Sequence, residues 1–171
     1  VQLVSGNYFA MLGLKPARGR LIQEDDAKAP GESPVVVLSD RYWRKAFGAD
    51  PDVIGQTVRL SGGQYTIVGI ARPDFPGGFP GIAVEAFAPV TMIALLMPAA
   101  ADEFENRGNN STFVRARMAP GVTLARVRAE LTALGASLHE RNVRGWEGDR
   151  SYSILPSRDV ILCPPIDRLL P

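Results

Sequence analysis

Cysteine and histidine are nearly absent from this chain of 171 residues, in which Cys163 and His139 are the single examples. A lone cysteine excludes a disulfide within the chain and a zinc site built from cysteines. A single histidine cannot complete the four-ligand cage of a structural zinc site. The sequence therefore indicates no metal and no other cofactor, and we expect none.

An excess of charge of one sign is lacking too, because 19 lysines and arginines are balanced by 18 aspartates and glutamates. Nucleic-acid binding relies on a basic surface that neutralises phosphates. Hydrophobic residues make up 46% and charged residues 22% of the chain, as is usual for folded domains. We therefore expect a folded domain without a nucleic-acid partner.

Apolar runs long enough to cross a membrane are missing as well. The longest apolar stretch, residues 82–101, is interrupted by Glu85, Pro89 and Pro98. It predicts a strand and then a short helix that ends at Pro98, rather than a membrane span. The opening "VQLVSGNYF" has no initiator Met and none of the features of a signal peptide. We therefore expect a fragment of a longer protein.

Common catalytic signatures do not occur. The sequence has neither a glycine-rich phosphate loop nor a G-x-S-x-G turn. His139 falls just past the apolar stripe of a predicted helix, where a surface histidine is expected. The acidic residues within 24–26 and 50–52 fit solvated loop or cap carboxylates. A small hydrolase that uses Asp25, Asp26 or His139 is the enzyme alternative, but the sequence favours a protein that is not an enzyme.

Strand and helix signals follow one another in the first half of the chain. "VVVL" at 35–38 is typical of a strand buried on both faces. Ser39 is placed as the N-cap of a short helix that Gly48 ends. One side of this helix gathers Tyr42, Trp43, Ala46 and Phe47. We expect these side chains in the core and the arginines pointing away from the rings, which disfavours a base-stacking platform.

A hairpin and an irregular loop come next. "QTVRLSGGQYTIVGI" predicts strands over 56–61 and 64–70 that are joined at a Gly-Gly turn. The proline- and glycine-rich loop at 71–81 carries Phe75 and Phe79 near its tip. Two aromatic residues on such a loop either dock onto the core or form a patch for a partner. Phe75 and Phe79 are therefore candidate partner-contact residues, and both alternatives stay open.

The second half of the chain predicts a strand, a helix and a strand. "STFVRARM" at 111–118 and "SYSILPS" at 151–157 have the composition of strands. Thr123 is placed as the N-cap of a helix. Its apolar residues recur at steps of three and four, which predicts a core-facing stripe of Leu124, Val127, Leu131, Leu134 and Leu138.

Several quoted segments, taken in order, carry a family resemblance. They read "VSGNYFAMLGLKPARGR" and "VVVLSDRYWRKAFGADPDVIGQTVRLSGGQYTIVGIARPDF". The pattern V-S-x-x-Y-F, G-R, V-V-L-S, D-P-x-x-x-G and a hairpin ending V-G-I resembles the periplasmic core domain of MacB-like (FtsX/MacB-type) ABC-transporter permeases. The residues found at these positions are similar to those in the large permeases of soil bacteria related to Acidobacteria. The resemblance covers residues 4 to about 75 closely and the later strand–helix–strand more loosely.

The resemblance implies an α+β fold with two lobes. A mixed, β-rich inserted (sabre-like) lobe with short helices would span residues 1–108. The C-terminal βαβ half of a porter-like lobe would span 111–157, and 158–171 would be a juxtamembrane linker. The N-terminal half of the porter lobe would be missing, which would leave apolar surface exposed on 111–157.

The resemblance also implies roles for individual residues. Turns and close packing would depend on glycines, namely Gly13, Gly55 and Gly69. The core would be filled by aromatic residues, namely Tyr8, Phe9, Trp43 and Phe47. No catalytic, cofactor-binding or metal-binding residue would be present.

The function that the resemblance implies is that of a periplasmic domain in an inner-membrane ABC-transporter permease. It would transmit ATP-driven motion of a cytoplasmic ATP-binding subunit or domain to export or mechanotransmission outside the membrane. The permease would pair as a homodimer and contact a periplasmic adaptor or a substrate. The alternative is a stand-alone extracytoplasmic module that binds a peptide or lipoprotein through the 71–81 loop.

Overall fold

The computed structural model describes residues 1–77, 82–102, 112–141 and 154–156. The chain divides into two compact units, one of Val1–Ala101 with Ile161–Pro171 and the other of Asp102–Val160. Among the described residues, no helix has both the length and the apolar character to cross a bilayer. Each unit is described by itself.

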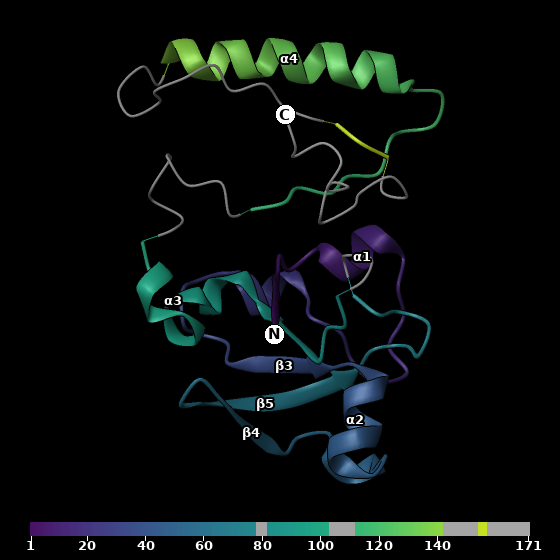
Figure 1. Cartoon of the computed structure of the whole chain (residues 1–171), viewed down its shortest axis with the longest axis vertical. Coiled ribbons are helices and arrows are strands. Elements are labelled where there is room, and N and C mark those ends of the chain that lie inside the picture. The colour runs from purple at the N-terminus through teal and green to yellow at the C-terminus, as the bar shows by residue number, and fades with distance from the viewer. Residues whose placement is uncertain (78–81, 103–111, 142–153, 157–171) are drawn as a thin grey trace, which may run out of the picture. The chain divides into compact units, whose positions relative to one another are not determined.

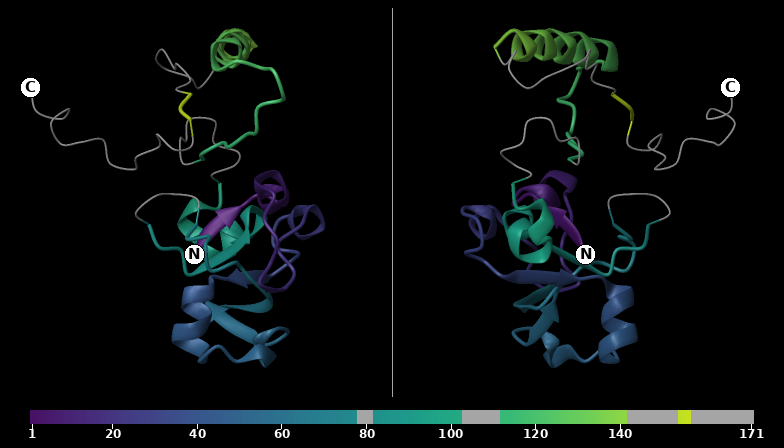
Figure 2. Two further views of the ribbon diagram at one scale, coloured as in Figure 1. Left: turned by 90° about the vertical axis from the view of Figure 1, so that its right-hand side faces the viewer. Right: turned by 60° about the vertical axis from the view of Figure 1, so that its left-hand side comes forward.

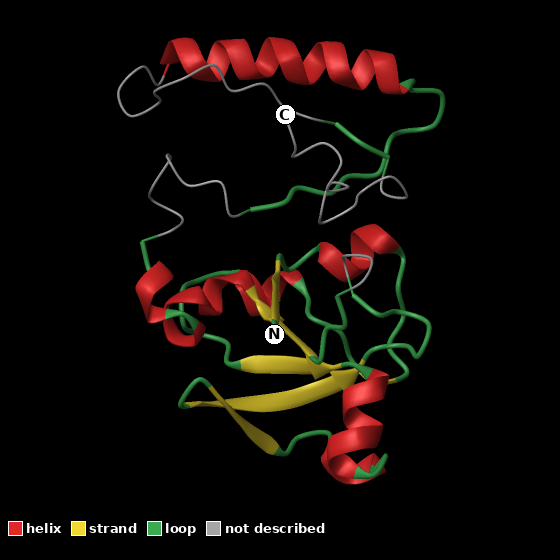
Figure 3. Ribbon diagram, viewed as in Figure 1, coloured by secondary structure: helices red, strands yellow, loops and turns green. Residues whose placement is uncertain are grey.

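A mixed six-stranded sheet forms the first unit and can be followed in Figures 1 and 3. The strands lie in the order β1-β6-β3-β5-β2, and β4 pairs with β5. β3 runs parallel to β5 and antiparallel to β6, so both of its edges are paired. The strands are β1 (Gln2–Val4), β2 (Arg18–Gly19), β3 (Val35–Leu38), β4 (Thr57–Leu60), β5 (Gly63–Ile70) and β6 (Ala86–Pro89).

Short helices connect these strands in the described part of the first unit. The α-helices are α1 (Tyr8–Leu12), α2 (Asp40–Phe47) and α3 (Ile93–Leu96). The 3₁₀ segments are η1 (Glu24–Ala27), η2 (Pro51–Val53), η3 (Val90–Met92) and η4 (Pro98–Ala100). The sequence predicted the strand and short helix before Pro98, and β6 and α3 confirm them.

Both faces of the sheet are covered, because side chains alternate along β3. Val36 and Leu38 belong to a cluster with Trp43 on one face. Val37 belongs to a second cluster with Phe9 on the other face. All three β3 side chains are fully buried, which confirms the prediction for this strand. On the first face, α2 lies alongside the β4–β5 hairpin, as both views of Figure 2 show.

Helix α2 begins and ends where the sequence predicted. The Ser39 hydroxyl accepts a hydrogen bond from the Tyr42 backbone N–H at 3.2 Å, and Gly48 ends the helix in a left-handed conformation. Trp43 is buried with 5% of its surface exposed, which confirms its place in the core. The prediction for Ala46 was wrong, because Ala46 is exposed at the edge of the helix face.

The arginines near Trp43 do not all point away from the ring, and this expectation was wrong. The guanidinium carbon of Arg44 lies 5.4 Å and that of Arg18 5.6 Å from the Trp43 ring centroid. Arg44 also donates hydrogen bonds to Asp40, at 2.8 and 3.2 Å. This carboxylate one turn earlier holds the long side chain beside the indole, where it gains a cation–π contact.

The predicted hairpin is present, but its turn lies one residue earlier than expected. Leu60 pairs with Gly63, so Ser61 and Gly62 form the turn, with φ angles of 47° and 85°. Gly63 is instead the first residue of β5. A Cβ atom at this position would lie 3.1 Å from the ring of Tyr65, so a glycine suits the strand here.

The second unit contains α4 (Leu124–Arg141), which confirms the predicted helix. Thr123 caps it, because its hydroxyl oxygen accepts a hydrogen bond from the Arg126 N–H at 3.3 Å. The flanking strands are not formed in the described parts of their ranges, residues 112–118 and 154–156, which Figure 3 draws as loop. A strand requires backbone partners, and the described part of this unit offers no second strand.

The described side chains of the second unit form no buried core. Leu134, on the helix stripe that was expected to face a core, is 51% exposed, and Val114 is 89% exposed. Phe113, Met118 and Leu155 are each more than half exposed. The described part of the unit thus has the exposed apolar surface that the family resemblance implied.

Candidate partner-contact site

Phe75 docks onto the first unit through other aromatic rings. Its ring stacks on Phe87, with the centroids 5.6 Å apart and the planes at 27°. The ring centroids of Phe9 and Tyr8 lie 6.0 and 6.4 Å from that of Phe75. The ring is half-buried, so part of its surface stays accessible. Phe79, the second candidate, lies outside the described residues.

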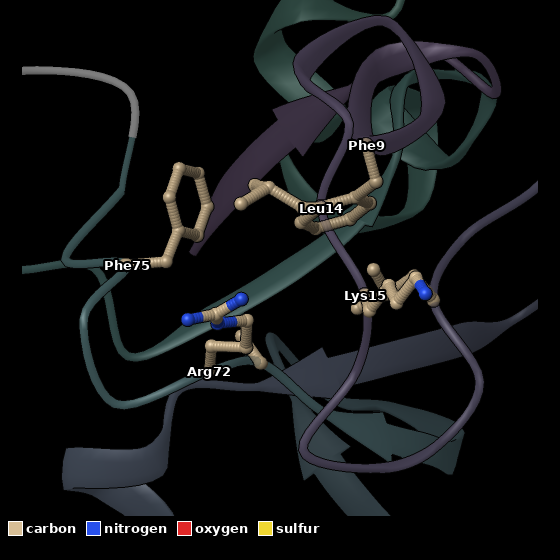
Figure 4. A pocket seen from close by; sticks show the side chains of 7 residues that line it. Phe9, Leu14, Lys15, Arg72 and Phe75 are labelled. Carbon is tan, nitrogen blue, oxygen red and sulfur yellow. The ribbon is translucent and has the colours of Figure 1, made fainter.

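A shallow surface hollow, too small to hold a water molecule, lies beside Phe75 (Figure 4). Its floor is apolar and buried, formed by Phe9, Leu21 and Ala71. Leu14 and Phe75 form its apolar walls. The walls come from the segment after α1 and from the segment after β5, which are far apart in the sequence.

Two basic side chains, Lys15 and Arg72, also line the hollow. Lys15 is exposed and makes no hydrogen bond or ion pair with another described residue. Arg72 donates from Nε and Nη2 to the two carboxylate oxygens of Asp74, at 2.9 and 2.8 Å. These hydrogen bonds lower the pKa of Asp74. The Nη1 group of Arg72 has no acceptor among the described residues.

Backbone hydrogen bonds fix the two segments that carry these side chains. The Ala17 N–H donates to the Ile70 carbonyl at 2.8 Å, which ties the segment after α1 to the end of β5. The Ala71 N–H donates to the Leu38 carbonyl at 2.8 Å, and the Leu14 N–H donates to the Phe9 carbonyl at 3.0 Å. The backbone on both sides of the hollow is therefore held by hydrogen bonds to the sheet.

The pairing of β2 with β5 supports this framework and depends on glycine. A Cβ atom on Gly69 would lie within 2.9 Å of three backbone atoms of Arg20, the closest being its carbonyl oxygen. This confirms that Gly69 serves close packing. The Arg20 N–H donates to the Val68 carbonyl at 2.9 Å directly beside this contact.

Asp26 fixes the segment that follows β2. It accepts hydrogen bonds from Arg20, at 2.6 and 2.8 Å, and from the Gln23 backbone N–H at 2.9 Å. Burial acts to raise the pKa of Asp26, but these hydrogen bonds outweigh it and the pKa is lowered. The expectation of a solvated carboxylate was therefore wrong for Asp26, which is buried and paired with Arg20, the residue that follows β2.

The other acidic candidates behave as expected of surface residues. Asp25 forms an exposed ion pair with Lys28 at 2.7 Å. The Asp50 carboxylate accepts a hydrogen bond from the Asp52 N–H at 2.9 Å, which confirms a cap. Among the described residues, no group of three or more acidic, histidine or cysteine side chains is placed to hold a metal ion. The side chain of His139 lies outside the described part.

Lys15, Leu14 and Arg72 were not identified from the sequence. They lie in loops without periodicity, and they line the same hollow because the Ala17 N–H donates to the Ile70 carbonyl and ties the segment after α1 to the end of β5. The single available signal was the "GLKPARGR" segment, whose proline and glycines marked a turn without indicating its neighbour. Long-range pairing of this kind leaves no local pattern in one sequence.

Comparison with known proteins identifies the family. The profile of the MacB-like periplasmic core domain matches residues 1–134 of the chain. The chain belongs to this family. The MacB-like assignment confirms the resemblance stated above, and the mixed sheet with short helices confirms the α+β fold class.

Relatives of this MacB-like domain are considerably longer than the part that aligns. The macrolide export ATP-binding/permease protein MacB of Aggregatibacter actinomycetemcomitans is 31% identical over 90 residues, which are 53% of this chain and 14% of that protein. MacB of Neisseria gonorrhoeae is 35% identical over 71 residues, which are 42% of this chain and 11% of that protein. The chain thus corresponds to a small part of these relatives.

A solved structure shares the fold of the MacB-like domain. The crystal structure of the periplasmic region of MacB from Actinobacillus actinomycetemcomitans matches with a TM-score of 0.55 and 21% sequence identity. The match covers 80% of this chain and 55% of that one. At this identity the comparison establishes the fold.

Proposed function

We propose that this chain is the extracytoplasmic, periplasmic domain of an inner-membrane ABC-transporter permease. The match of residues 1–134 to the MacB-like periplasmic core domain carries the proposal. The full-length permease works with a cytoplasmic ATP-binding subunit or domain and pairs as a homodimer. Its work outside the membrane is export or mechanotransmission, with a periplasmic adaptor or a substrate as the further partner.

The domain contributes movement rather than bond chemistry. Its buried acidic side chains serve the scaffold, since Asp26 binds Arg20 and Asp40 binds Arg44. A sheet that is packed on both faces resists deformation and moves as one body. Rigid-body displacement of such a unit carries a change at the membrane to a distant surface.

The two lobes of this proposal follow the family pattern. Residues 1–108 are an inserted lobe, 111–157 are half of a porter-like lobe, and 158–171 are a juxtamembrane linker. Support comes from the second unit, where Leu134 is 51% exposed and the described side chains form no buried core. A unit that buries so little apolar surface needs further strands for stability, and another part of the permease supplies them.

Translation of the DNA on either side of the coding segment is the first test. The permease requires apolar segments of about 20 residues on both sides. A signal peptide directly upstream together with a stop codon directly downstream would instead favour a stand-alone peptide- or lipoprotein-binding module. That result would refute the permease.

Topology is the second test, and it uses the full-length protein. Lys45 is exposed on α2, and Lys45→Cys is made in a background in which Cys163 is replaced by Ser. We expect this cysteine to react with a membrane-impermeant maleimide in intact spheroplasts. Reaction only after lysis would place the domain in the cytoplasm and contradict the proposal.

Movement of the lobes is the third test. Spin labels at Lys45 and Ala129, both exposed and one in each unit, are compared in nucleotide-free and vanadate-trapped permease. We expect the label-to-label distance to differ between the two states. A matched pair within the first unit, Lys28 and Lys45, keeps one distance. Identical distances between the units in both states would refute mechanical transmission.

A further inference from the structure

We infer that Arg18, which lies over the Trp43 ring on the edge strand β2, binds a carboxylate of a partner protein. This inference rests on the proposed function, in which the domain is displayed to other proteins outside the membrane. It adds the residue and the chemistry by which an acidic side chain of such a partner is recognised.

The Trp43 ring is a rigid base for this site. Only 5% of Trp43 is exposed, and its indole N–H donates to the Asp50 carbonyl at 2.8 Å. The guanidinium carbon of Arg18 lies 5.6 Å from the ring centroid. A guanidinium that lies over an aromatic ring is ordered before a ligand arrives and can still donate from its N–H groups. Binding therefore costs less ordering here than at an isolated surface arginine.

The charge of Arg18 is not balanced. Arg44 lies over the same ring, at 5.4 Å, but it donates to the Asp40 carboxylate at 2.8 and 3.2 Å. Arg18 is exposed and makes no hydrogen bond or ion pair with another described residue. Arg44 already covers the indole with a charge that Asp40 neutralises, so Arg18 brings a further positive charge beside it. A carboxylate supplies the missing charge and two acceptor oxygens in the geometry of a guanidinium.

Helix α2 adds positive charge on the same side. Arg41, Arg44 and Lys45 are spaced three and four residues apart, so their side chains leave one side of the helix. Arg41 and Lys45 are exposed, and neither has an ion-pair partner in the described part of the chain. The field of these cations attracts an anion towards the Trp43 ring.

The charge balance of the whole chain favours a single carboxylate over a polyanion. Membrane surfaces and nucleic acids are bound through extended clusters of basic residues, whereas this chain has 19 basic and 18 acidic residues. One local basic site on such a chain suits one aspartate or glutamate of a partner. No cavity is required, because the cations are at the surface, where the Arg44 side chain is 60% exposed.

The test uses the 171-residue chain labelled with ¹⁵N and the probe peptide acetyl-Gly-Asp-Gly-amide at low ionic strength, where screening is weak. We expect saturable shift changes at the Arg18 Nε–H and at the Trp43 indole N–H, whose signal is identified by its loss in Trp43→Phe. Replacement of Asp by Asn in the peptide is expected to weaken binding by about tenfold, since the charge-assisted contact is lost.

Variants of the chain provide the matched comparison. Arg18→Gln is expected to weaken peptide binding by about tenfold, with circular dichroism to verify the fold. Arg59→Gln removes the same charge from an exposed position of β4 and is expected to bind as wild type. Arg18→Lys keeps the charge without the planar guanidinium and is expected to bind with intermediate affinity. Absence of saturable shifts, equal binding of the Asp and Asn peptides, or equal losses in Arg18→Gln and Arg59→Gln would each overturn the inference.

A lipid headgroup is tested separately, by sedimentation of the chain with vesicles of phosphatidylglycerol and phosphatidylcholine. We expect no binding that depends on Arg18. Loss of vesicle binding in Arg18→Gln alone would assign the site to a membrane and overturn the choice of a protein carboxylate.

Failure of this inference is distinguishable from failure of the permease proposal. Maleimide labelling and the flanking apolar segments report on the membrane topology and do not depend on Arg18. A permease with the expected topology and no peptide binding would overturn the carboxylate site alone.

Discussion

Replacement of Gly69 by alanine is expected to separate β2 from β5 and thereby to open the hollow. The added Cβ would lie within 2.9 Å of the Arg20 carbonyl oxygen, carbonyl carbon and nitrogen. These are backbone atoms held in the sheet, so they cannot move aside as a flexible side chain would. The strain has to be relieved by displacement of the whole β2 segment.

The size of the effect follows from what that displacement breaks. Two backbone hydrogen bonds are at stake, from Arg20 to Val68 at 2.9 Å and from Ala17 to Ile70 at 2.8 Å. Each is worth about 1 kcal/mol, and overpacking a tight contact costs about 1–3 kcal/mol more. We therefore expect Gly69→Ala to lower the free energy of unfolding by about 3–5 kcal/mol.

Urea unfolding followed by far-ultraviolet circular dichroism measures this change. Gly62→Ala is the control for the contact, because Gly62 has no atom within 4 Å of the added Cβ, although unlike Gly69 it has a positive φ, of 85°. That control introduces only the strain of a side chain at positive φ and no contact, and it is expected to cost about 1 kcal/mol. Equal stabilities of the two variants, or a Gly69→Ala protein within about 0.5 kcal/mol of wild type, would refute the reasoning.

Three further changes test other parts of the fold. Trp43→Ala is expected to lower the free energy of unfolding in urea by about 3–5 kcal/mol, because removal of the buried ring leaves a cavity. Trp43→Phe loses chiefly the 2.8 Å hydrogen bond from the indole N–H to the Asp50 carbonyl, so it is expected to cost less. Asp26→Asn removes a carboxylate whose pKa is lowered from 3.8. The variant is expected to have a lower free energy of unfolding than wild type, and this difference is full above pH 3.8 and disappears as the pH falls through the lowered pKa. A difference that grows in acid would contradict the pairing with Arg20. Ser61→Asn is expected to raise the free energy of unfolding by about 0.5 kcal/mol, and with it the urea midpoint, because asparagine suits the left-handed first position of this turn better than serine. A lowered midpoint would argue against the turn.

Local signals predicted most of the first unit. The buried run at β3, the Ser39 cap and the alternation in the β4–β5 hairpin each lie within a short window of sequence, so their physical causes are readable there. The family resemblance supplied the arrangement of these pieces. The turn at Ser61 was misplaced by one residue because two adjacent glycines offered equivalent positions, and the ring of Tyr65 decided between them.

Contacts between distant segments could not be predicted. Lys15 and Arg72 line one hollow because the segment after α1 is hydrogen-bonded to the end of β5, and this pairing has no local signature. Asp26 was expected to be solvated for a different reason, because its partner Arg20, only six residues earlier, lies in a loop segment where no periodicity indicates the pairing. The strand at 111–118 was expected from composition, but composition cannot supply the neighbouring strand that its hydrogen bonds need.

The position of β1 at the edge of the sheet determines how the first unit responds to tension. β1 and β6 run parallel, with Gln2 opposite Phe87 and Val4 opposite Pro89. A pull that draws Val1 one way and the residues after Pro89 the other way slides the two strands lengthwise. All bonds between them then bear the load together, instead of opening one after another as in a zipper. A sheet loaded through these two strands would hold its shape under force.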